Sequence, residues 1–321
     1  MEPITLADVR TAATRIAPHV WRTPLVACEP LSAALRCDLR FKAESLQHGG
    51  AFKARGACNA VFALSDDEAL RGVVTHSSGN HAAALARAAT RRGIPVYVVM
   101  PHNASPIKLA AVRAYGVEPI LCEPTSEARE RAALEAQERY GARLVHPYDD
   151  PLVMAGQGTL ALEVIDDWPE IDTVVVPVSG GGLLAGVLTA IKAIRPEVQV
   201  IAAEPAWADD TARSLASGKN EVPTRYDTLA DGLRAAVGKL TLPVLTRWLD
   251  DLILVEEETI RAATRTISAE ARLVAEYSGA VPLAAVMTTP ERFAGRRVGL
   301  VVSGGNLDMG GCRLGESPRS A

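Results

Sequence analysis

The segment Val174-Val175-Val176-Pro177-Val178-Ser179-Gly180-Gly181-Gly182-Leu183-Leu184-Ala185-Gly186 joins an apolar strand pattern to a helical pattern across three glycines. Consecutive glycines let backbone N–H groups converge on an anion, and the N-terminus of a helix attracts negative charge. The segment therefore predicts a cradle of the size of a phosphate group. Two other interpretations stay open: a dinucleotide fingerprint, whose G-x-G-x-x-G spacing is met imperfectly, and a plain strand-to-helix turn.

The same order of strand and helix recurs along the chain. Runs rich in Val and Ile predict strands at 73–75, 96–99, 119–121, 144–145, 174–176, 198–202, 252–255 and 298–302. Helical patterns are found at 5–19, 82–90, 127–140 and 183–194, and Thr5 with Asp8 predicts a capped start for the first of them. This alternation predicts an α/β fold with open, twisted, mostly parallel sheets and helices on both faces. A ligand crevice is expected where the strands end.

Composition narrows the class of protein. The chain has 321 residues, 48% of them hydrophobic and 22% charged, which is typical of a globular enzyme with two lobes. A net charge of −4 provides no basic surface for nucleic acid and no polybasic membrane anchor. Five cysteines without CxxC spacing predict reduced thiols, and no secretory signal is visible. We therefore expect a cytoplasmic protein with a small-molecule substrate.

Lys53 lies in the run Gly49-Gly50-Ala51-Phe52-Lys53-Ala54-Arg55-Gly56, and two further polar loops occupy 77–81 and 303–306. A lysine amine condenses with an aldehyde, so one amine, a phosphate cradle and two polar loops indicate a site for pyridoxal phosphate. Each feature also has an ordinary explanation. Lys53 taken alone is more typical of a surface lysine, and the loops are typical of a helix cap and a turn.

Together these runs resemble the fold-type II pyridoxal-phosphate enzymes, within them the threonine/serine dehydratase and serine racemase group. The resemblance covers nearly the whole chain and includes Arg22–Leu25, Phe41–Glu44, Ala155–Thr159, Ala230–Gly232 and Glu276–Ala280. It implies a tryptophan synthase β-like fold, with a large cofactor domain at 1–68 and 147–321 and a small substrate-side domain at 69–146. It also implies a homodimer.

The resemblance assigns roles residue by residue. Lys53 would form the Schiff base with the cofactor and then act as a base, and Ser78 would serve the opposite face of the substrate. The implied cofactor-binding residues are Phe52, Lys53, Asn80, Ser179, Gly180, Gly181, Gly182, Leu183, Glu276 and Ser303. The implied substrate residues are Ser77, Ser78, Gly79, His81 and Arg129. Arg129 is equally typical of an exposed helical arginine, and His48 could reach the cleft or be structural.

The resemblance also implies a metal site. Glu204 and Asp210 would supply carboxylates and Ala208 a backbone carbonyl, a set of oxygen ligands that suits Mg²⁺ or Ca²⁺. The alternative interpretation is a solvated acidic turn.

The expected activity is that of an ammonia-lyase acting on a β-hydroxy-α-amino acid. Gly49, Ala51, Ala235, Ala236 and Tyr277 depart from the residues common in relatives, which removes hydroxyls near the substrate. A bulkier or more acidic substrate is therefore expected, such as a hydroxyaspartate, phenylserine or an ectoine-pathway intermediate. The alternatives are an amino-acid racemase, a non-catalytic cofactor-binding protein and a dinucleotide-dependent dehydrogenase.

Overall fold

The computed structural model describes residues 4–77 and 79–307. The strands are β1 (Leu25–Ala27), β2 (Asp38–Ala43), β3 (Val73–His76), β4 (Val96–Pro101), β5 (Ile120–Cys122), β6 (Arg143–Leu144), β7 (Thr173–Pro177), β8 (Gln199–Pro205), β9 (Asp251–Val255) and β10 (Arg297–Val302). The α-helices are α1 (Leu6–Ile16), α2 (Glu29–Leu35), α3 (Lys53–Phe62), α4 (Asp66–Arg71), α5 (Asn80–Arg92), α6 (Pro106–Arg113), α7 (Ser126–Tyr140), α8 (Pro151–Asp167), α9 (Gly182–Ile194), α10 (Asp210–Ser217), α11 (Thr241–Trp248), α12 (Glu257–Thr266) and α13 (Tyr277–Thr288). Short helical turns are η1 (Glu44–Leu46), η2 (His48–Gly50), η3 (Ala206–Ala208), η4 (Asp231–Leu233), η5 (Ile267–Ala271) and η6 (Pro290–Arg292).

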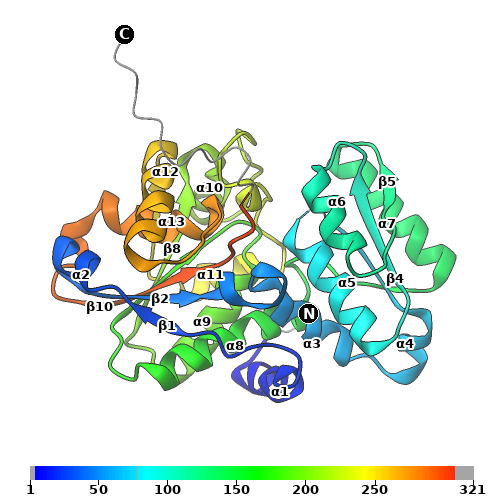
Figure 1. Cartoon of the computed structure of the whole chain (residues 1–321), viewed down its shortest axis with the longest axis horizontal. Coiled ribbons are helices and arrows are strands. Elements are labelled where there is room, and N and C mark those ends of the chain that lie inside the picture. Colours follow the sequence, from blue (N-terminus) through cyan, green and yellow to red (C-terminus); the bar gives the residue numbers. More distant parts are fainter. Residues whose placement is uncertain (1–3, 78, 308–321) are drawn as a thin grey trace, which may run out of the picture.

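The strands form two sheets, one in each of the two lobes seen in Figure 1. The larger sheet has the order β1-β2-β10-β7-β8-β9, and the smaller has the order β5-β4-β3-β6. All pairs are parallel except β1 with β2, which confirms the predicted mostly parallel α/β fold. The strands of the small sheet all come from 73–144, inside the predicted small domain. The domain limits themselves stay a prediction.

Both faces of the large sheet are covered by helices, as the continuous apolar strands require. Val174 and Val176 of β7 pack with α1, α8, α9 and α11 on one face. Val175 points to the other face and packs with α2, α12 and α13. Because successive residues of a strand point to opposite sides, one apolar run supplies both cores. Figure 1 shows the sheet between these two helix layers.

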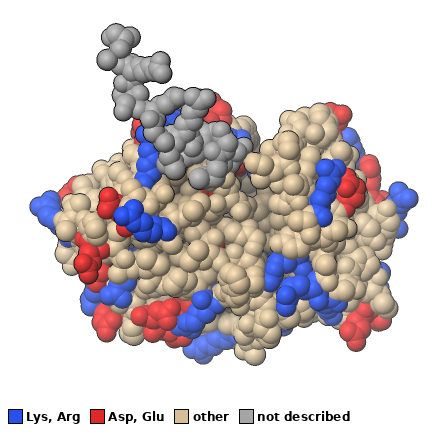
Figure 2. All heavy atoms as spheres, viewed as in Figure 1, with Lys and Arg blue, Asp and Glu red and all other residues tan. Residues whose placement is uncertain are grey.

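The small sheet repeats this arrangement with fewer helices. Val98 and Met100 of β4 pack against α5 and α6, whereas Val99 packs with residues of α7 on the opposite face. The space-filling view shows a notch between the two lobes (Figure 2). The carboxyl ends of β3 and β10 carry the two polar loops that the sequence singled out, at 77–81 and 303–306.

Several local expectations can be compared with the described residues. Thr5 and Asp8 form a complete capping box at the start of α1, as predicted. Cys28, Cys37, Cys58 and Cys122 are free thiols, whereas Cys312 lies outside the described residues. Within the part of the chain that is described, no helix has both the length and the apolar character needed to cross a membrane. The strands β1 and β2 were not predicted.

Candidate active site

Lys53 is placed by backbone pairing with the end of β10. The N–H of Phe52 donates to the carbonyl oxygen of Ser303 at 3.0 Å, and the N–H of Gly305 donates to that of Gly50 at 2.9 Å. Gly50 has a φ of +71°, a region that L side chains rarely adopt, which explains a glycine at this tight turn. Two segments 250 residues apart thus come together, and α3 begins at Lys53 between them.

The amine of Lys53 points towards the segment between β6 and α8. Its Nζ donates to the carbonyl oxygen of Pro147 at 2.7 Å, in the segment that returns the chain from β6 to α8. Burial lowers the pKa of Lys53 to about 8, against the smaller opposing effect of the Glu276 charge. A half-buried position and a hydrogen bond to a backbone carbonyl distinguish Lys53 from an ordinary surface lysine. A partly neutral amine near neutral pH is a nucleophile and a base.

The glycine loop has free donors at the start of α9. Gly181 is the N-cap with a φ of +86°, and no side chain caps the helix. In the described part of the chain, the N–H groups of Gly182, Leu183 and Leu184 have no hydrogen-bond acceptor. All three residues are buried. Buried N–H groups without acceptors at a helix N-terminus fit a phosphate group.

The loop has no room for side chains. A Cβ atom on Gly181 would lie 2.7 Å from Thr241 Oγ1, and one on Gly180 would lie 2.4 Å from the ring of Tyr148. Ser179 donates through its hydroxyl to the Ala235 carbonyl oxygen at 2.9 Å and accepts from the Ala235 N–H. The predicted phosphate residues therefore form one rigid loop, closed on one side by Tyr148, which the sequence interpretation did not name.

Asn80, Glu276 and Ser303 lie beside the Lys53 turn. Asn80 Nδ2 donates to Glu276 Oε1 at 2.8 Å, and Asn306 Nδ2 donates to Asn80 Oδ1 at 2.9 Å. Burial and the nearby charge of Asp231 raise the pKa of Glu276 to about 7. The buried Ser303 hydroxyl has no partner among the described residues, so it is available to a ring nitrogen.

The predicted substrate residues lie around the end of β3. Ser77 and Gly79 follow the strand, and the side chain of Ser77 accepts a hydrogen bond from the Gly79 N–H at 3.3 Å. His81 is buried in the first turn of α5, where burial holds its pKa well below the usual range. Burial lowers the pKa of His76, and the charge of Arg129, in the first turn of α7, adds to this effect. The predicted second base, Ser78, lies outside the described residues.

Two further histidines belong to this region although the sequence interpretation did not name them. His76 is the last residue of β3, and His146 lies next to Pro147, the partner of Lys53. Their rings meet edge to face with centroids 5.4 Å apart. Both positions follow predicted strands, so the rule that sites lie at strand ends was the signal available in the sequence. His48, by contrast, packs against Trp21 with ring centroids 4.2 Å apart.

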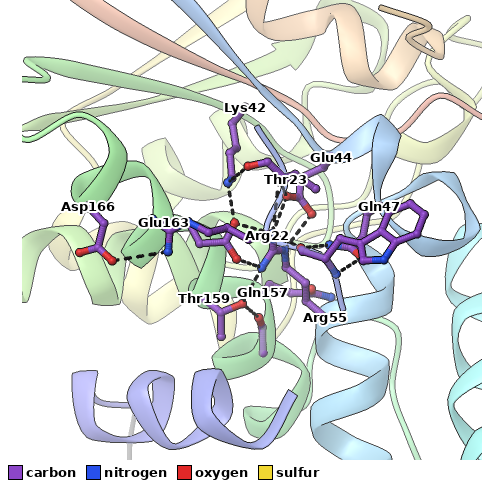
Figure 3. A network of polar contacts seen from close by, with 12 residues as sticks. Arg22, Thr23, Lys42, Glu44, Gln47, Arg55, Gln157, Thr159, Glu163 and Asp166 are labelled. Carbon is purple, nitrogen blue, oxygen red and sulfur yellow. Dashed lines mark hydrogen bonds and ion pairs between the residues drawn. The ribbon is translucent and has the colours of Figure 1, made fainter. Parts of the chain in front are cut away.

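A buried polar network is centred on Arg55, two residues after Lys53 in α3 (Figure 3). The guanidinium of Arg55 is fully buried and forms forked hydrogen bonds to Glu44 (2.7 and 2.8 Å) and Glu163 (2.6 and 2.9 Å). Lys42 Nζ also donates to Glu163, at 2.5 Å. Two buried cations therefore balance two carboxylates. The network joins the first turn of α3 to η1 and α8, and it joins α8 to β2, so it holds in place the helix that begins at Lys53.

The predicted metal residues are also buried. Glu204, at the end of β8, accepts from the N–H groups of Thr211 (2.8 Å) and Ala212 (2.9 Å). Asp210 accepts through Oδ2 from the Val237 N–H at 2.9 Å, whereas its buried Oδ1 has no partner. Because both carboxyls are fully buried, the solvated acidic turn is wrong.

Burial raises the pKa of Glu204 to about 8 and that of Asp210 to about 6. A partnerless carboxylate oxygen fits a bound cation. The described residues contain no cluster of three or more His, Cys, Asp or Glu side chains that could hold a metal. A cation here would therefore need backbone oxygens, such as that of Ala208, and water.

Comparisons with known proteins agree with this geometry. Residues 16–304 match the family described as "Pyridoxal-phosphate dependent enzyme". The chain is 46% identical to a serine racemase of Oryza sativa subsp. japonica over 94% of this chain and 91% of the relative. It is 43% identical to a β-hydroxyaspartate dehydratase of Paracoccus denitrificans over 95% of this chain and 97% of the relative. The solved structure of maize serine racemase superposes with a TM-score of 0.94 at 44% identity, covering 96% of this chain and 95% of that one.

Proposed function

Because the chain belongs to the family of pyridoxal-phosphate dependent enzymes, we propose that it is a dehydratase that converts a β-hydroxy-α-amino acid to a 2-oxo acid and ammonia. The observation that carries the proposal is the Lys53 amine, which is held by the Pro147 carbonyl oxygen beside the glycine loop and has a pKa of about 8. When bound, the cofactor supplies an aldehyde for the substrate amine and a ring that withdraws electrons from the α-carbon.

The residues of this chain have separate tasks in that reaction. The free N–H groups at the start of α9 would hold the cofactor phosphate, and the Ser303 hydroxyl would face the ring nitrogen. The neutral amine of Lys53 accepts the α-proton. The α C–H bond breaks as Lys53 takes the proton, and the β C–O bond breaks as hydroxide leaves and is protonated to water, so that one water is lost overall. The released enamine is then hydrolysed to the 2-oxo acid and ammonia. A serine opposite the ring nitrogen cannot keep it firmly protonated, which suits elimination better than transamination.

A substrate panel with detection of ammonia and 2-oxo acid tests the activity. We expect turnover of at least one β-hydroxy amino acid, and loss of turnover together with loss of the visible absorbance of bound cofactor in Lys53→Ala. A yellow protein without turnover on any β-hydroxy amino acid would instead support the non-catalytic alternative.

We propose an acidic or bulky β-hydroxy amino acid as the substrate. The missing hydroxyls at Gly49 and Ala51 support this choice, and so does the similarity to the Paracoccus enzyme named as a β-hydroxyaspartate dehydratase. The values of kcat/KM for β-hydroxyaspartate, phenylserine, L-threonine and L-serine should decide it. A clear preference for L-serine would defeat this part of the proposal.

A racemase is the second candidate, because the rice and maize relatives carry that name. In that case Lys53 and Ser78 would exchange protons with opposite faces of the α-carbon. Chiral analysis of the amino acid left after partial turnover separates the two activities. Ser78→Ala should abolish any racemisation and reduce elimination less, and an equal loss of both would contradict the two-face arrangement.

We also propose Mg²⁺ or Ca²⁺ at Glu204, Asp210 and the Ala208 carbonyl. The orphaned Asp210 Oδ1 supports this site. Added Mg²⁺ should raise the melting temperature of the wild type and leave that of Asp210→Ala unchanged. A homodimer in the cytoplasm completes the proposal, and sedimentation velocity and cell fractionation test these two points.

A further inference from the structure

Three polar rings form a row along the cleft beside Lys53. The rings of His76 and His146 meet edge to face, and those of His146 and Tyr148 do the same with centroids 4.5 Å apart. The Tyr148 ring lies directly over Gly180, where a Cβ would come within 2.4 Å of it. This ring row, defined as His76, His146 and Tyr148, therefore runs from the glycine loop to the start of the Ser77 loop.

The proton on His146 has a defined position. His146 Nδ1 accepts from the backbone N–H of Asp149 at 2.9 Å and from that of Tyr148 at 3.4 Å. An imidazole nitrogen that accepts carries no proton, so the proton of neutral His146 is on Nε2. Burial, with the nearby charges of His76 and Lys53, lowers the pKa of His146 to about 3. The Nε2–H group is therefore a fixed, uncharged donor at neutral pH.

The ring row has hydrogen-bonding capacity that the protein does not use. Within residues 4–77 and 79–307, nothing forms a hydrogen bond with His146 Nε2, with either ring nitrogen of His76, or with the Tyr148 hydroxyl. None of these atoms is among the fully buried polar atoms that lack a partner, so each remains partly open to solvent. Burial raises the pKa of Tyr148 to about 12, which keeps its hydroxyl protonated.

The row also lies close to the reactive amine and to charged groups of α7. Pro147, whose carbonyl oxygen holds Lys53 Nζ, stands between His146 and Tyr148 in the chain. Arg129 and Glu130, in the first turn of α7, are near enough to influence the pKa values of His76 and Tyr148.

We propose that the ring row is the subsite for an oxygen-bearing substituent on the β-carbon of the substrate, with Tyr148 Oη and His146 Nε2–H as donors to that oxygen. The inference rests on the proposed function and names its substrate class: amino acids with a hydroxyl or carboxylate at the β-carbon. An apolar β-substituent would leave these donors unpaired, and sites built around hydrogen-bond donors reject such analogues strongly.

Binding of non-hydroxylated amino acids tests the subsite. L-aspartate carries a carboxylate on its β-carbon, whereas L-alanine carries no β-oxygen. The holoenzyme is titrated with each, and binding is followed by the visible absorbance of the bound cofactor. We expect the wild type to bind L-aspartate at least about tenfold more tightly than L-alanine. Tyr148→Phe, which keeps the ring over Gly180, should reduce this ratio severalfold with unchanged affinity for pyridoxal phosphate.

His146 requires two variants because its Nδ1 also supports the loop. His146→Leu should bring the binding ratio close to one. His146→Gln can accept the Asp149 N–H and still donate, so it should restore most of the ratio. A wild-type ratio near one would overturn the subsite, as would an unchanged ratio in both Tyr148→Phe and His146→Leu. Weaker cofactor binding with an unchanged ratio in Tyr148→Phe would reassign Tyr148 to the cofactor and overturn it too.

Failure of this inference differs from failure of the proposed function. If the variants lower the ratio of L-aspartate to L-alanine affinity but the wild type turns over no β-hydroxy amino acid, the subsite stands and the proposed dehydratase activity is wrong. If the wild type releases ammonia and the affinity ratio is unchanged in the variants, the proposed dehydratase activity stands and the subsite is wrong.

Discussion

Lys53 and Glu276 have pKa values that burial moves towards each other. Burial lowers that of Lys53 to about 8 and raises that of Glu276 to about 7, and the charge of each group favours the charged form of the other. An ordinary lysine is almost wholly protonated at neutral pH. The apoenzyme therefore presents an amine with a useful neutral fraction in the range where enzymes work, because the fold surrounds it with the uncharged Pro147 and His146 segment.

The pH dependence of cofactor capture should report this shift. Only the neutral amine attacks an aldehyde, so the rate at which apoenzyme takes up pyridoxal phosphate should rise with pH through a midpoint of about 8 instead of the ordinary 10.5. Glu276→Gln removes a negative charge that favours the protonated amine, so its midpoint should be lower. Stopped-flow absorbance measures both, with Glu197→Gln as a distant surface control. A wild-type midpoint near 10 would contradict the shift.

Arg55 anchors the helix that begins at Lys53, so its loss should weaken the whole fold. Arg55→Met leaves Glu44 and Glu163 buried without their shared cation, which should reduce the free energy of unfolding by about 3–5 kcal/mol. Arg55→Lys keeps the charge but cannot form the forked hydrogen bonds, so its loss of stability should be smaller than that of Arg55→Met. Urea unfolding of cofactor-saturated protein measures both variants. Glu197→Gln, on an exposed ion pair, should change little, and a Met variant as stable as the wild type would refute the argument.

The helices α8 and α9 touch through glycine. A Cβ on Gly186 would lie 2.3 Å from the Met154 carbonyl oxygen and 2.6 Å from the Gly158 nitrogen. Gly186→Ala must therefore push the helices apart, which should destabilise the protein by about 1–3 kcal/mol. Because α9 starts at the glycine loop, affinity for pyridoxal phosphate should also fall. Thermal unfolding and absorbance titration measure the two effects. An unchanged melting temperature and cofactor affinity would show that the helices can accommodate the added methyl group.

The elements that could be predicted from the sequence are those whose apolar pattern is local. The strands β3 to β10 were predicted in this way, with β5 and β6 each displaced by one residue. The strand β2 was missed because Arg40 and Lys42 interrupt its apolar run. Lys42 can be buried there only because Glu163, 121 residues later, accepts its hydrogen bond. That pairing is a property of the folded chain, and no local pattern contains it.

The same distinction holds for the site. Lys53 and the glycine loop are recognisable because each is a continuous run with its own chemistry. His146 and Tyr148 lie in an unremarkable stretch, and their role appears only when the return segment from the small sheet lies over Gly180. His146 Nε2 is a free donor only because a backbone N–H group donates to His146 Nδ1. No sequence pattern indicates that hydrogen bond.

Two polar contacts join the lobes beside the site. Asn80 of α5 donates to Glu276, and an ion pair joins Lys108 of α6 to Asp231 of η4 at 2.5 Å. Both side chains of that pair are about two-fifths exposed, at 38% and 41%. An exposed pair adds little to stability, but this one joins elements of different lobes across the mouth of the site. Its effect should therefore appear in substrate binding.

Breaking this pair should weaken the contact between the lobes at the mouth of the site. In Asp231→Asn and in Lys108→Met we expect KM for the amino acid to rise severalfold, with a melting temperature close to that of the wild type. Added salt screens exposed charges, so KM of the wild type should rise with ionic strength and that of either variant should respond less. The double variant should add little to either single change, since both remove one interaction. Glu118→Gln, which breaks the exposed pair with Arg113 inside the small lobe, is the matched control. Two results would show that Lys108 and Asp231 do not act as a pair between the lobes. One is an additive effect in the double variant, and the other is a wild-type KM that does not change with ionic strength.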